Sequence, residues 1–474
     1  MSILVKRYKK SNRSISLNIL PHQLIAYNFL QNNRGIILFH KMGSGKTISS
    51  LYVAIKFSKP TIIIGPKSSK KSFIDDLDKL ATIMSIRKDD FKFYSYQKII
   101  NMLLSDFDLL KDKIIIIDEA HHLRSQTPNM MHIINNLIYA YKIILLTGTP
   151  IINHPIDLCV LVNIVKNSEI FTIDKALFEF YYIDRLNDFN TESKSTIYII
   201  LKLKNIEELK TRLSNSITFY EPLSDKSNIR TDIYYPEVPL NQIQLIEYKK
   251  YIAKLINPLT KRIVHLETDI NSDDFNIDFV SLDTKRKNAF LVATRQLSNT
   301  IDNDPSSPKI LELMKYVIEG PKPIVIYSNF LANGIFPISI QLNKYQISYR
   351  MIKGTTSEEK MNQIINEYNN RLFDVLLISS AASESISLLN TRQMHILEPH
   401  FNEAKINQVI GRAIRYKSHE KLNADSRQVS IYHWTSIFPN IIKYKTADQY
   451  LIWLSKKKQQ LINEFINVVK EVSL

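Results

Sequence analysis

Short apolar runs alternate with helix-period segments through the first half of this 474-residue chain. The apolar runs are Gly35–Phe39, Thr61–Ile64, Ile114–Ile117 and Ile143–Leu146. Each is brief, apolar throughout and bounded by polar or turn residues, as expected of strands that are buried on both faces of a parallel sheet. Because segments of helical periodicity lie between the runs, the pattern predicts an open α/β sheet.

The same alternation returns from about Pro308 to the end of the chain. It predicts strands at Ile324–Tyr327, Gln346–Met351, Asp374–Ile378, Met394–Leu397 and Val429–His433. Helices are predicted at Ile310–Ile318 and Ser357–Tyr368, and a final helix opens with the capping box Thr446-Ala-Asp-Gln449. This half therefore predicts a second α/β lobe.

Between residues 166 and 305 the pattern is weaker. Asp184–Ser195 and Thr268–Asp278 are polar and are interpreted as loops, whereas Tyr248, Tyr251 and Leu255 have helical spacing. The predicted fold class is α/β, with one parallel-sheet lobe at 1–240, a partly helical connector at 241–305 and a second lobe at 306–474.

Composition limits the classes of function. The formal net charge of +16 favours a polyanionic partner, although lysines that merely solvate the surface would give the same number. No run of 18 or more apolar residues occurs, so no membrane association is expected. Cys159 is the one cysteine, which excludes an internal disulfide and a cysteine-based zinc site and fits a reducing intracellular compartment.

The segment His40-Lys-Met-Gly-Ser-Gly-Lys-Thr47 lies directly between a predicted strand and a predicted helix. Gly43 and Gly45 allow the backbone to turn its N–H groups toward phosphate oxygens, at the positive end of the new helix. Lys46 can reach the β- and γ-phosphates of ATP, and Thr47 can supply a hydroxyl to Mg²⁺. An ordinary glycine-rich turn before a helix is the alternative.

The segment Ile114-Ile-Ile-Ile-Asp-Glu-Ala-His121 places two acids at the end of an apolar strand. Asp118 is predicted to hold Mg²⁺ through water, and Glu119 to orient and deprotonate the attacking water. Two acids in the first turn of a helix would give the same Asp-Glu dipeptide. Because the phosphate-loop pattern occurs in the same sequence, the catalytic interpretation is favoured.

The third signal is Gln408-Val-Ile-Gly-Arg-Ala-Ile-Arg415 in the second half. On a helix, Gln408, Arg412 and Arg415 would share one face, and two outward arginines suit a phosphoryl group whose charge rises in the transition state. A solvated basic face is the alternative.

In this order the three motifs resemble those of superfamily 2 helicases, and more closely the Swi/Snf-like branch. Leu20-Pro-His-Gln23 looks like the adenine-sensing segment of that branch, and Thr147-Gly-Thr-Pro150 like its motif that couples hydrolysis to lobe movement. Second-lobe motifs match by order and spacing at Ile326–Phe330, Lys353–Thr356 and Ser379–Ser385. The resemblance implies two RecA-like lobes and an ATP site formed by Gln23, Gly43, Ser44, Gly45, Lys46, Thr47 and Asp118.

Further details resemble the ATPases of large DNA viruses that are related to the poxvirus early transcription factor small subunit and nucleoside triphosphatase I. They are Leu38–Thr47, Ile217-Thr-Phe-Tyr-Glu221 and Gly411–Arg415. This resemblance implies a DNA-dependent ATPase in viral transcription, in the virion or the host cytoplasm, with a viral RNA polymerase or transcription factor subunit as a possible partner. Ser385 stands where many relatives have glycine, and His40 replaces a small residue.

The resemblance also implies contacts to nucleic acid, with DNA favoured over RNA. The positions carried over are Pro66, Lys67, Ser328 and Thr355, whose amides and hydroxyls would follow phosphates without reading bases. Three hypotheses remain: a DNA-dependent ATPase or translocase, a strand-separating helicase on RNA or DNA, and an ATP-binding scaffold with vestigial hydrolysis.

Overall fold

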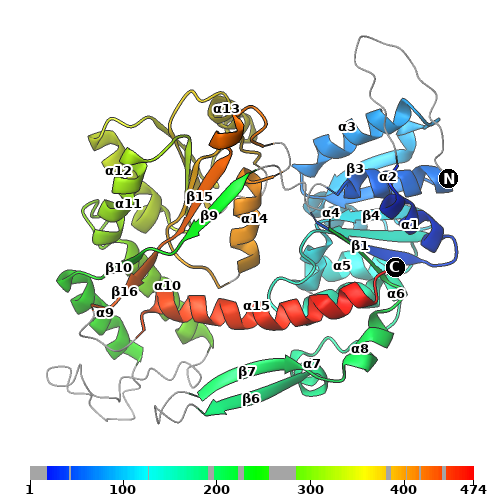
Figure 1. The fold of residues 1–474 in the computed structure, drawn as a ribbon. Helices are drawn as coiled ribbons and strands as arrows, with labels where there is room; N and C mark the ends of the chain where they lie inside the picture. Colours follow the sequence, from blue (N-terminus) through cyan, green and yellow to red (C-terminus); the bar gives the residue numbers. More distant parts are fainter. Residues whose placement is uncertain are drawn as a thin grey trace. The chain divides into compact units, whose positions relative to one another are not determined.

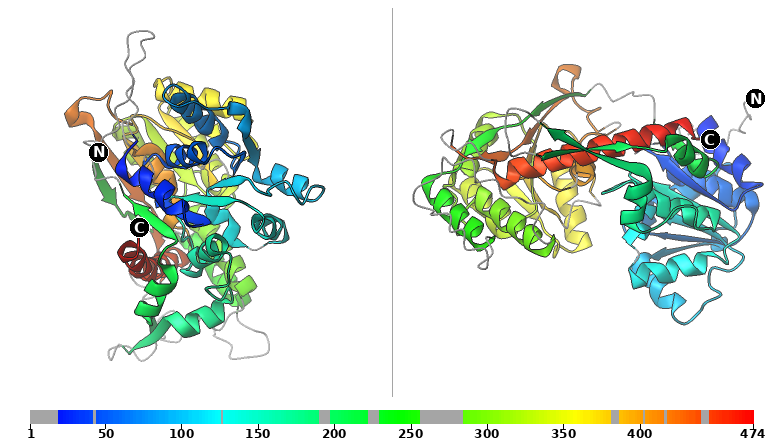
Figure 2. Two further views of the ribbon diagram at one scale, coloured as in Figure 1. Left: turned by 90° about the vertical axis from the view of Figure 1, so that its right-hand side faces the viewer. Right: turned by 90° about the horizontal axis from the view of Figure 1, so that it is seen from below.

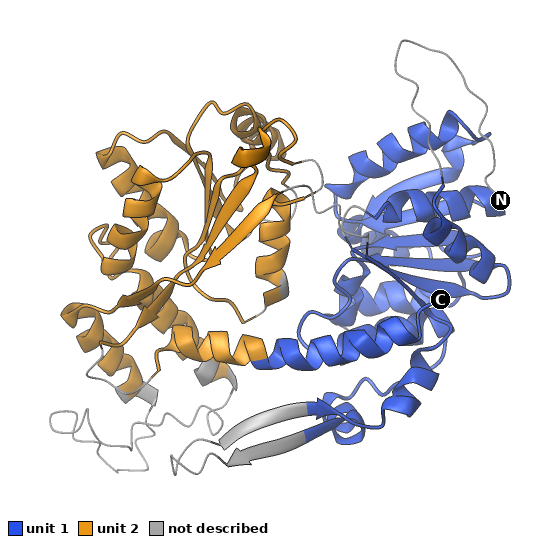
Figure 3. Cartoon of the chain, viewed as in Figure 1, with its two compact units in different colours: residues 1–191, 196–224, 457–474 blue, residues 192–195, 225–456 orange. Residues whose placement is uncertain are grey.

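The computed structural model of the chain has two compact units (Figure 3). Unit 1 comprises residues 1–191, 196–224 and 457–474, and unit 2 comprises residues 192–195 and 225–456. The residues described by the structure are 19–41, 44–125, 127–189, 197–221, 229–255, 284–380, 386–401, 403–415, 418–439 and 445–474.

Unit 1 is built on a six-stranded parallel sheet with the order β3-β2-β4-β5-β1-β8 (Figure 1). Its strands are β1 (Gly35–His40), β2 (Thr61–Gly65), β3 (Phe91–Ser95), β4 (Ile114–Asp118), β5 (Lys142–Thr147) and β8 (Ile217–Tyr220). The four predicted strands are confirmed to within one residue at each end. The edge strands β3 and β8 were not predicted, because each has a half-buried face and lacks a continuous apolar run.

Helices cover both faces of the unit 1 sheet. They are α1 (Pro21–Leu30), α2 (Lys46–Phe57), α3 (Ser69–Ala81), α4 (Tyr96–Leu103), α5 (Pro128–Leu137), α6 (Ile156–Lys166), α7 (Lys175–Tyr182), α8 (Ile206–Leu213) and the end of α15 (Ala447–Glu471). Alternate residues of β1 point to opposite faces, so Ile36 and Leu38 pack with α1, α2 and α3. Ile37 and Phe39 pack against the other layer, which includes α4, α5, α6 and part of α15.

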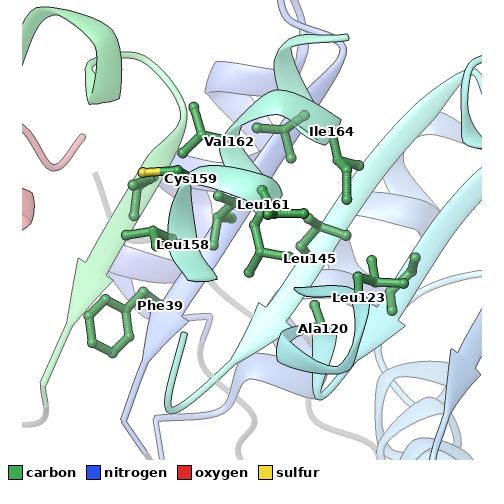
Figure 4. Close-up of a cluster of buried hydrophobic side chains, with 14 of the residues drawn as sticks. Phe39, Ala120, Leu123, Leu145, Leu158, Cys159, Leu161, Val162 and Ile164 are labelled. Atoms are coloured by element: carbon green, nitrogen blue, oxygen red, sulfur yellow. The ribbon is translucent and has the colours of Figure 1, made fainter. Parts of the chain in front are cut away.

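Helix α6 supplies much of this second layer. Leu158, Cys159 and Leu161 are fully buried beside the strands that carry Phe39 and Leu145 (Figure 4). Burial raises the pKa of the Cys159 thiol well above its ordinary value, so this cysteine behaves as an apolar side chain.

Unit 2 contains another six-stranded parallel sheet, with the order β12-β13-β11-β14-β15-β9. Its strands are β9 (Arg230–Tyr234), β11 (Ile324–Ser328), β12 (Tyr349–Ile352), β13 (Val375–Ser379), β14 (Gln393–Ile396) and β15 (Gln428–His433). A separate parallel pair is β10 (Glu237–Pro239) with β16 (Thr435–Ile437). β12 starts three residues later than predicted because Gln346 has φ 56°, in the left-handed region, and ends a turn.

The helices of unit 2 include two that lie in the predicted connector. The set is α9 (Gln242–Leu255), α10 (Thr284–Asn299), α11 (Pro308–Glu319), α12 (Phe336–Lys344), α13 (Glu358–Asn369), α14 (Glu403–Ala413) and the start of α15. α9 and α10 pack together with Leu451 of α15, through Tyr248 and Phe290. The predicted helical character is confirmed, and both helices fall within unit 2.

Helix α15 begins with the predicted capping box. Thr446 N donates to Gln449 Oε1 (3.0 Å), and Gln449 N donates to Thr446 Oγ1 (3.3 Å). Figure 2 shows α15, coloured red, as one unbroken helix. Its last part contributes Phe465 and Val469 to the core of unit 1. Residues 457–474 therefore belong to unit 1, although the sheet that precedes them in the sequence belongs to unit 2.

The segment after α7 differs from the sequence interpretation. β6 (Ile183–Phe189) and β7 (Ile197–Leu203) pair antiparallel as a β-ribbon, so Asp184–Phe189 of the segment interpreted as a loop is a strand. Residues 190–195 of that segment lie outside the described residues. β6 was not predicted from the sequence, because polar residues occur at both alternating sets of its positions and neither set is apolar throughout. The predicted loop Thr268–Asp278 lies outside the described residues.

Candidate functional site

The predicted motifs of unit 1 meet at one edge of its sheet. β2, β4, β5 and β1 are parallel neighbours, so their carboxyl ends, where ligands bind in open α/β folds, lie side by side. A Cβ placed on Gly148, after β5, would lie 3.5 Å from Lys46 Nζ, and one on Gly65 at the end of β2 would lie 3.1 Å from Asp118 Cβ. The structure therefore brings the phosphate-loop lysine, the acidic pair and Thr147-Gly-Thr-Pro150 together.

The phosphate loop connects β1 to α2. Gly45 has φ 76°, a conformation that favours glycine, and α2 begins at Lys46, so the helix N-terminus follows the loop directly. Lys46 Nζ donates to the carbonyl oxygens of His40 (2.6 Å) and Lys41 (3.5 Å). Ser44 Oγ is buried and has no hydrogen-bond partner among the described residues, as suits a loop that takes an additional ligand. Gly43 lies outside the described residues.

Gln23 lies in the first turn of α1 and contacts the phosphate loop. Its Oε1 accepts from Leu20 N (2.8 Å), its Nε2 faces Gly45 O (3.5 Å), and the side chain is only 4% exposed. A Cβ on Gly45 would lie 2.6 Å from Gln23 Nε2, so a larger residue there would displace the Gln23 amide, and φ 76° at Gly45 itself favours glycine. Adenine sensing by Gln23 stays a prediction.

Asp118 is the last residue of β4, and Glu119 follows with φ 50° at the start of the 3₁₀ turn Ala120–Ser125. Both backbone carbonyls are held by one phenol, because Tyr96 Oη donates to Asp118 O (2.8 Å) and to Glu119 O (3.2 Å). Burial, followed by the two carboxylates, raises the pKa of Tyr96 well above its ordinary value, so the phenol stays a donor. Sequence reasoning missed Tyr96, since it belongs to no motif.

The charges at this edge influence one another. Burial, followed by the charge of Glu119, raises the pKa of Asp118, while a hydrogen bond from the Ser69 side chain and the charge of Lys46 act in the opposite direction. Burial lowers the pKa of Lys46, and Glu119 and Asp118 oppose that change. A desolvated carboxylate of this kind favours a bound cation.

The donor set fits Mg²⁺ in particular. No cluster of three or more His, Cys, Asp or Glu side chains suited to a metal occurs among the described residues. Mg²⁺ needs no such cage, because it binds one or two protein ligands together with water and substrate phosphates. Asp118 and the Thr47 hydroxyl are the residues that would hold it.

His121 connects the acidic pair to the next motif. Its Nδ1 lies 3.3 Å from Glu119 Oε2 and 3.4 Å from Thr147 Oγ1, which also accepts from Thr149 N (3.1 Å). Arg124 Nη1 in turn donates to His121 O (2.8 Å). One imidazole therefore contacts both the proposed base and the Thr147–Pro150 segment.

Two of the predicted nucleic-acid positions follow β2 in unit 1. Pro66 O accepts from Ser69 N (3.0 Å) in the turn that starts α3, and Lys67 is exposed beside it. The first turn of α3 contains no acidic residue, so its positive end is not neutralised by its own side chains. This turn adjoins Asp118 through Ser69.

Ser328 and Thr355 of unit 2 differ in exposure. Ser328 ends β11, is fully buried and donates to Glu398 Oε2 (3.0 Å), so its side chain does not reach the surface where a phosphate would bind. The sequence motif does not show whether Ser328 is exposed, because its burial depends on packing against Glu398, a residue distant in the sequence. Thr355 is exposed in the turn between β12 and α13.

The arginine motif spans the end of α14. Gln408 and Arg412 lie on the helix, but α14 ends at Ala413, so Arg415 is not placed by the helical spacing that was used to predict it. Arg415 N donates to Ser418 Oγ (3.2 Å). Burial, followed by the charge of Arg412, lowers the pKa of Arg415 from its ordinary value. Ser385, the other departure noted above, lies outside the described residues.

In the described parts of the chain, no helix is both long enough and apolar enough to span a bilayer.

Comparison with protein families identifies both halves. A model of the SNF2-related domain matches residues 4–217, and a model of the helicase conserved C-terminal domain matches residues 308–417.

Several viral proteins match nearly the whole chain. A protein of Acanthamoeba polyphaga mimivirus that carries the name of an ATP-dependent RNA helicase is 43% identical over 461 residues, which cover 97% of this chain and 98% of that protein. The early transcription factor 70 kDa subunit of fowlpox virus (strain NVSL) is 25% identical, over 89% of this chain and 72% of its own length. The nucleoside triphosphatase I of Melanoplus sanguinipes entomopoxvirus is 23% identical, over 94% and 76%.

Among solved structures, the Sulfolobus solfataricus SWI2/SNF2 ATPase core in complex with dsDNA aligns with 97% of this chain and 98% of that chain. The sequence identity is 18% and the TM-score is 0.35.

Proposed function

Because the chain belongs to the SNF2-related ATPases of helicase superfamily 2 and is an ATP hydrolase, we propose that it is a nucleic-acid-stimulated motor that moves along DNA in viral transcription. The observation that carries this proposal is the edge of the unit 1 sheet, where Lys46, Asp118 and Glu119 meet. The third sequence hypothesis, a scaffold with vestigial hydrolysis, does not fit these intact residues.

In the proposed reaction, the phosphate loop binds the triphosphate of ATP and Lys46 contacts its outer phosphates. Lys46 now donates to His40 O, so binding requires only an exchange of one acceptor for another. Glu119 orients the attacking water and accepts its proton, while His121 holds the carboxylate through the 3.3 Å contact. Asp118 and Thr47 would hold Mg²⁺, which when bound would supply positive charge at the phosphates.

The second unit completes the site in this proposal. Arg412 and Arg415 would contact the γ-phosphate when ATP is bound, because guanidinium groups suit the charge that develops on a transferring phosphoryl group. Gln408, one turn before Arg412 on α14, would join them. Closing and opening around ATP would then advance the protein along the nucleic acid.

Binding of nucleic acid is proposed through backbone phosphates. Lys67 and Thr355 are exposed, and the α3 N-terminus beside Lys67 has no acidic side chain in its first turn. The net charge of +16 adds a general attraction. Contacts of this kind depend little on base sequence.

We expect binding of duplex DNA to weaken steeply with salt and to vary little with base sequence, since each neutralised phosphate releases counterions. Lys67→Ala should reduce the slope of log Kd against log salt concentration by about one, for one lost phosphate contact. Titrations by fluorescence anisotropy at several salt concentrations measure both. Lys92→Ala is the matched control, because Lys92 is also exposed but pairs with Ile62, near the start of β2. Equal slopes for the Lys67 variant and the wild type would contradict the assignment.

Strand separation is the second candidate function, on RNA or DNA, and one observation favours it. Separating a duplex requires an element that inserts between paired strands, and the β6–β7 hairpin of unit 1 is an antiparallel ribbon of the kind that such an element needs. The name of the mimivirus relative also refers to an RNA helicase. The names of the poxvirus relatives refer instead to transcription and nucleoside triphosphate hydrolysis.

One experiment distinguishes the two functions. ATPase activity is first measured with single-stranded DNA, duplex DNA and RNA as stimulants. Displacement of a triplex-forming strand is then compared with separation of a tailed duplex by the same protein. We expect stimulation by DNA and ATP-dependent triplex displacement, with little unwinding of the duplex. Efficient unwinding without a partner protein would instead establish the helicase function, and stimulation by RNA alone would exclude action on DNA.

A further inference from the structure

The residue in front of the phosphate loop is a buried histidine. His40 ends β1 and is 0% exposed, and its Nε2 makes a 2.9 Å hydrogen bond with the Thr218 hydroxyl of β8. Burial, followed by the charges of His22 and Lys46, lowers the pKa of His40 to about 3, so the imidazole is neutral at physiological pH. The carbonyl oxygen of the same residue accepts from Lys46 Nζ at 2.6 Å. His40, whose carbonyl oxygen accepts from the phosphate-binding lysine, is therefore held in place by its hydrogen bond to Thr218 of β8.

A second histidine connects β8 to the other end of the loop. The rings of His22 and Tyr220 are stacked, with centroids 3.5 Å apart and planes 5° from parallel. His22 Nε2 makes a 3.0 Å hydrogen bond with Ser44 O, inside the loop. β8 also accepts a backbone hydrogen bond at the loop entrance, from Lys41 N to Tyr220 O (2.9 Å).

We propose that Thr218 and Tyr220 are positioning residues of the nucleotide site, which act through His40 and His22 on the two ends of the phosphate loop. The inference rests on the proposed function, because it concerns the ATP site described above. A small residue in place of His40 would leave the start of the loop free to change conformation. The cluster of two histidines, Thr218 and Tyr220 holds the two ends of the loop, at His40 and Ser44, before ATP arrives, so less conformational entropy is lost on binding.

The test of Thr218 uses an isosteric change. Thr218→Val removes the hydroxyl without changing the volume, and Thr218→Ser keeps the hydroxyl. Loss of one neutral hydrogen bond corresponds to about a 3- to 10-fold weaker binding of nucleotide. We expect that loss for Thr218→Val in the Kd of a fluorescent ADP analogue, measured with and without Mg²⁺. The KM for ATP should rise in parallel and kcat should be unchanged, whereas Thr218→Ser should behave as the wild type.

Two comparisons show whether the effect passes through His40. In a His40→Ala background, the further change Thr218→Val should have no additional effect, because the contact is already absent. Thr211→Val is the control, since Thr211 is exposed on α8. The melting temperature of every variant shows that it is folded. Additive effects of the two changes, or a Thr218→Val protein that binds nucleotide like the wild type, would overturn the role of Thr218.

Tyr220 is tested through its ring. Tyr220→Phe retains the stack on His22 and should bind nucleotide as the wild type does, whereas Tyr220→Leu should bind more weakly. Equal binding by the Leu and Phe variants would remove Tyr220 from the proposal. A wild-type protein that binds no nucleotide would overturn both this inference and the proposed function. A wild-type protein that binds and hydrolyses ATP, beside fully active variants, would overturn the inference alone.

Discussion

Replacing Glu119 with glutamine should leave ATP binding intact and lower turnover by about 10²- to 10⁴-fold, the range for loss of a positioned general base. The amide has nearly the same shape as the carboxylate but cannot accept the proton of the attacking water. Phosphate binding depends on the loop and on Lys46, which the change leaves in place, and the charge of Asp118 still opposes the lowering of the Lys46 pKa. Because the lost interaction serves the chemical step, kcat should fall far more than the affinity for nucleotide.

The measurement pairs two assays of the Glu119→Gln protein. One is steady-state hydrolysis with DNA present, and the other is the Kd of a fluorescent nucleotide. Glu169→Gln is the matched control, because Glu169 is exposed between α6 and α7 in the same unit and should hydrolyse ATP normally. Wild-type turnover by the Glu119 variant would falsify the assignment of this residue as the base. A parallel loss of binding would give it a structural role instead.

Arg415→Ala should lower DNA-stimulated turnover by about 10³-fold or more, the range for an arginine that stabilises the transition state of phosphoryl transfer. The contact is proposed to form only when both units engage ATP. Binding of nucleotide to unit 1 should therefore be nearly unchanged, which separates this arginine from Lys46. Arg415→Lys should recover little activity, because an ammonium group lacks the planar fork of donors.

Stopped-flow single-turnover assays, with the protein in saturating excess over ATP and with DNA present, test this expectation. Arg371→Lys is the control, since Arg371 is exposed in the turn after α13 and lies outside the motif. If Arg415→Ala hydrolyses ATP at the wild-type rate while Arg412→Ala does not, Arg412 alone serves the reaction. Full activity of both variants would leave the pair as a basic surface, the alternative raised by the sequence.

Parallel strands that are buried on both faces were predictable, because they must be apolar throughout. β1, β2, β4 and β5 therefore appear in the sequence almost residue by residue. Three of the four edge strands of the two sheets, β3, β8 and β9, lack this signature and were missed, whereas the fourth, β12, was predicted with an early start. Because β8 was missed, the contacts of Thr218 and Tyr220 with the histidines around the phosphate loop could not be predicted.

Local sequence motifs identified the family, the phosphate loop and the acidic pair, because each depends on a few residues at short spacing. Contacts between distant parts of the chain were beyond the reach of such motifs. Tyr96 holds the backbone of Asp118 from 22 residues away, and Thr218 reaches His40 across 178 residues. The burial of the Ser328 hydroxyl could not be predicted either, because it depends on the hydrogen bond with Glu398.

The sequence by itself determined the two α/β lobes, the ATP chemistry and the order of the motifs, because burial and phosphate binding restrict residue type at each position. Only the tertiary structure decided which unit each segment joins. Helices α9 and α10 pack in unit 2 because their apolar faces meet Phe438 and Leu451, and the end of α15 packs in unit 1 through Phe465. An amphipathic helix specifies that it must be covered, whereas its partner is set by contacts between residues far apart in the chain.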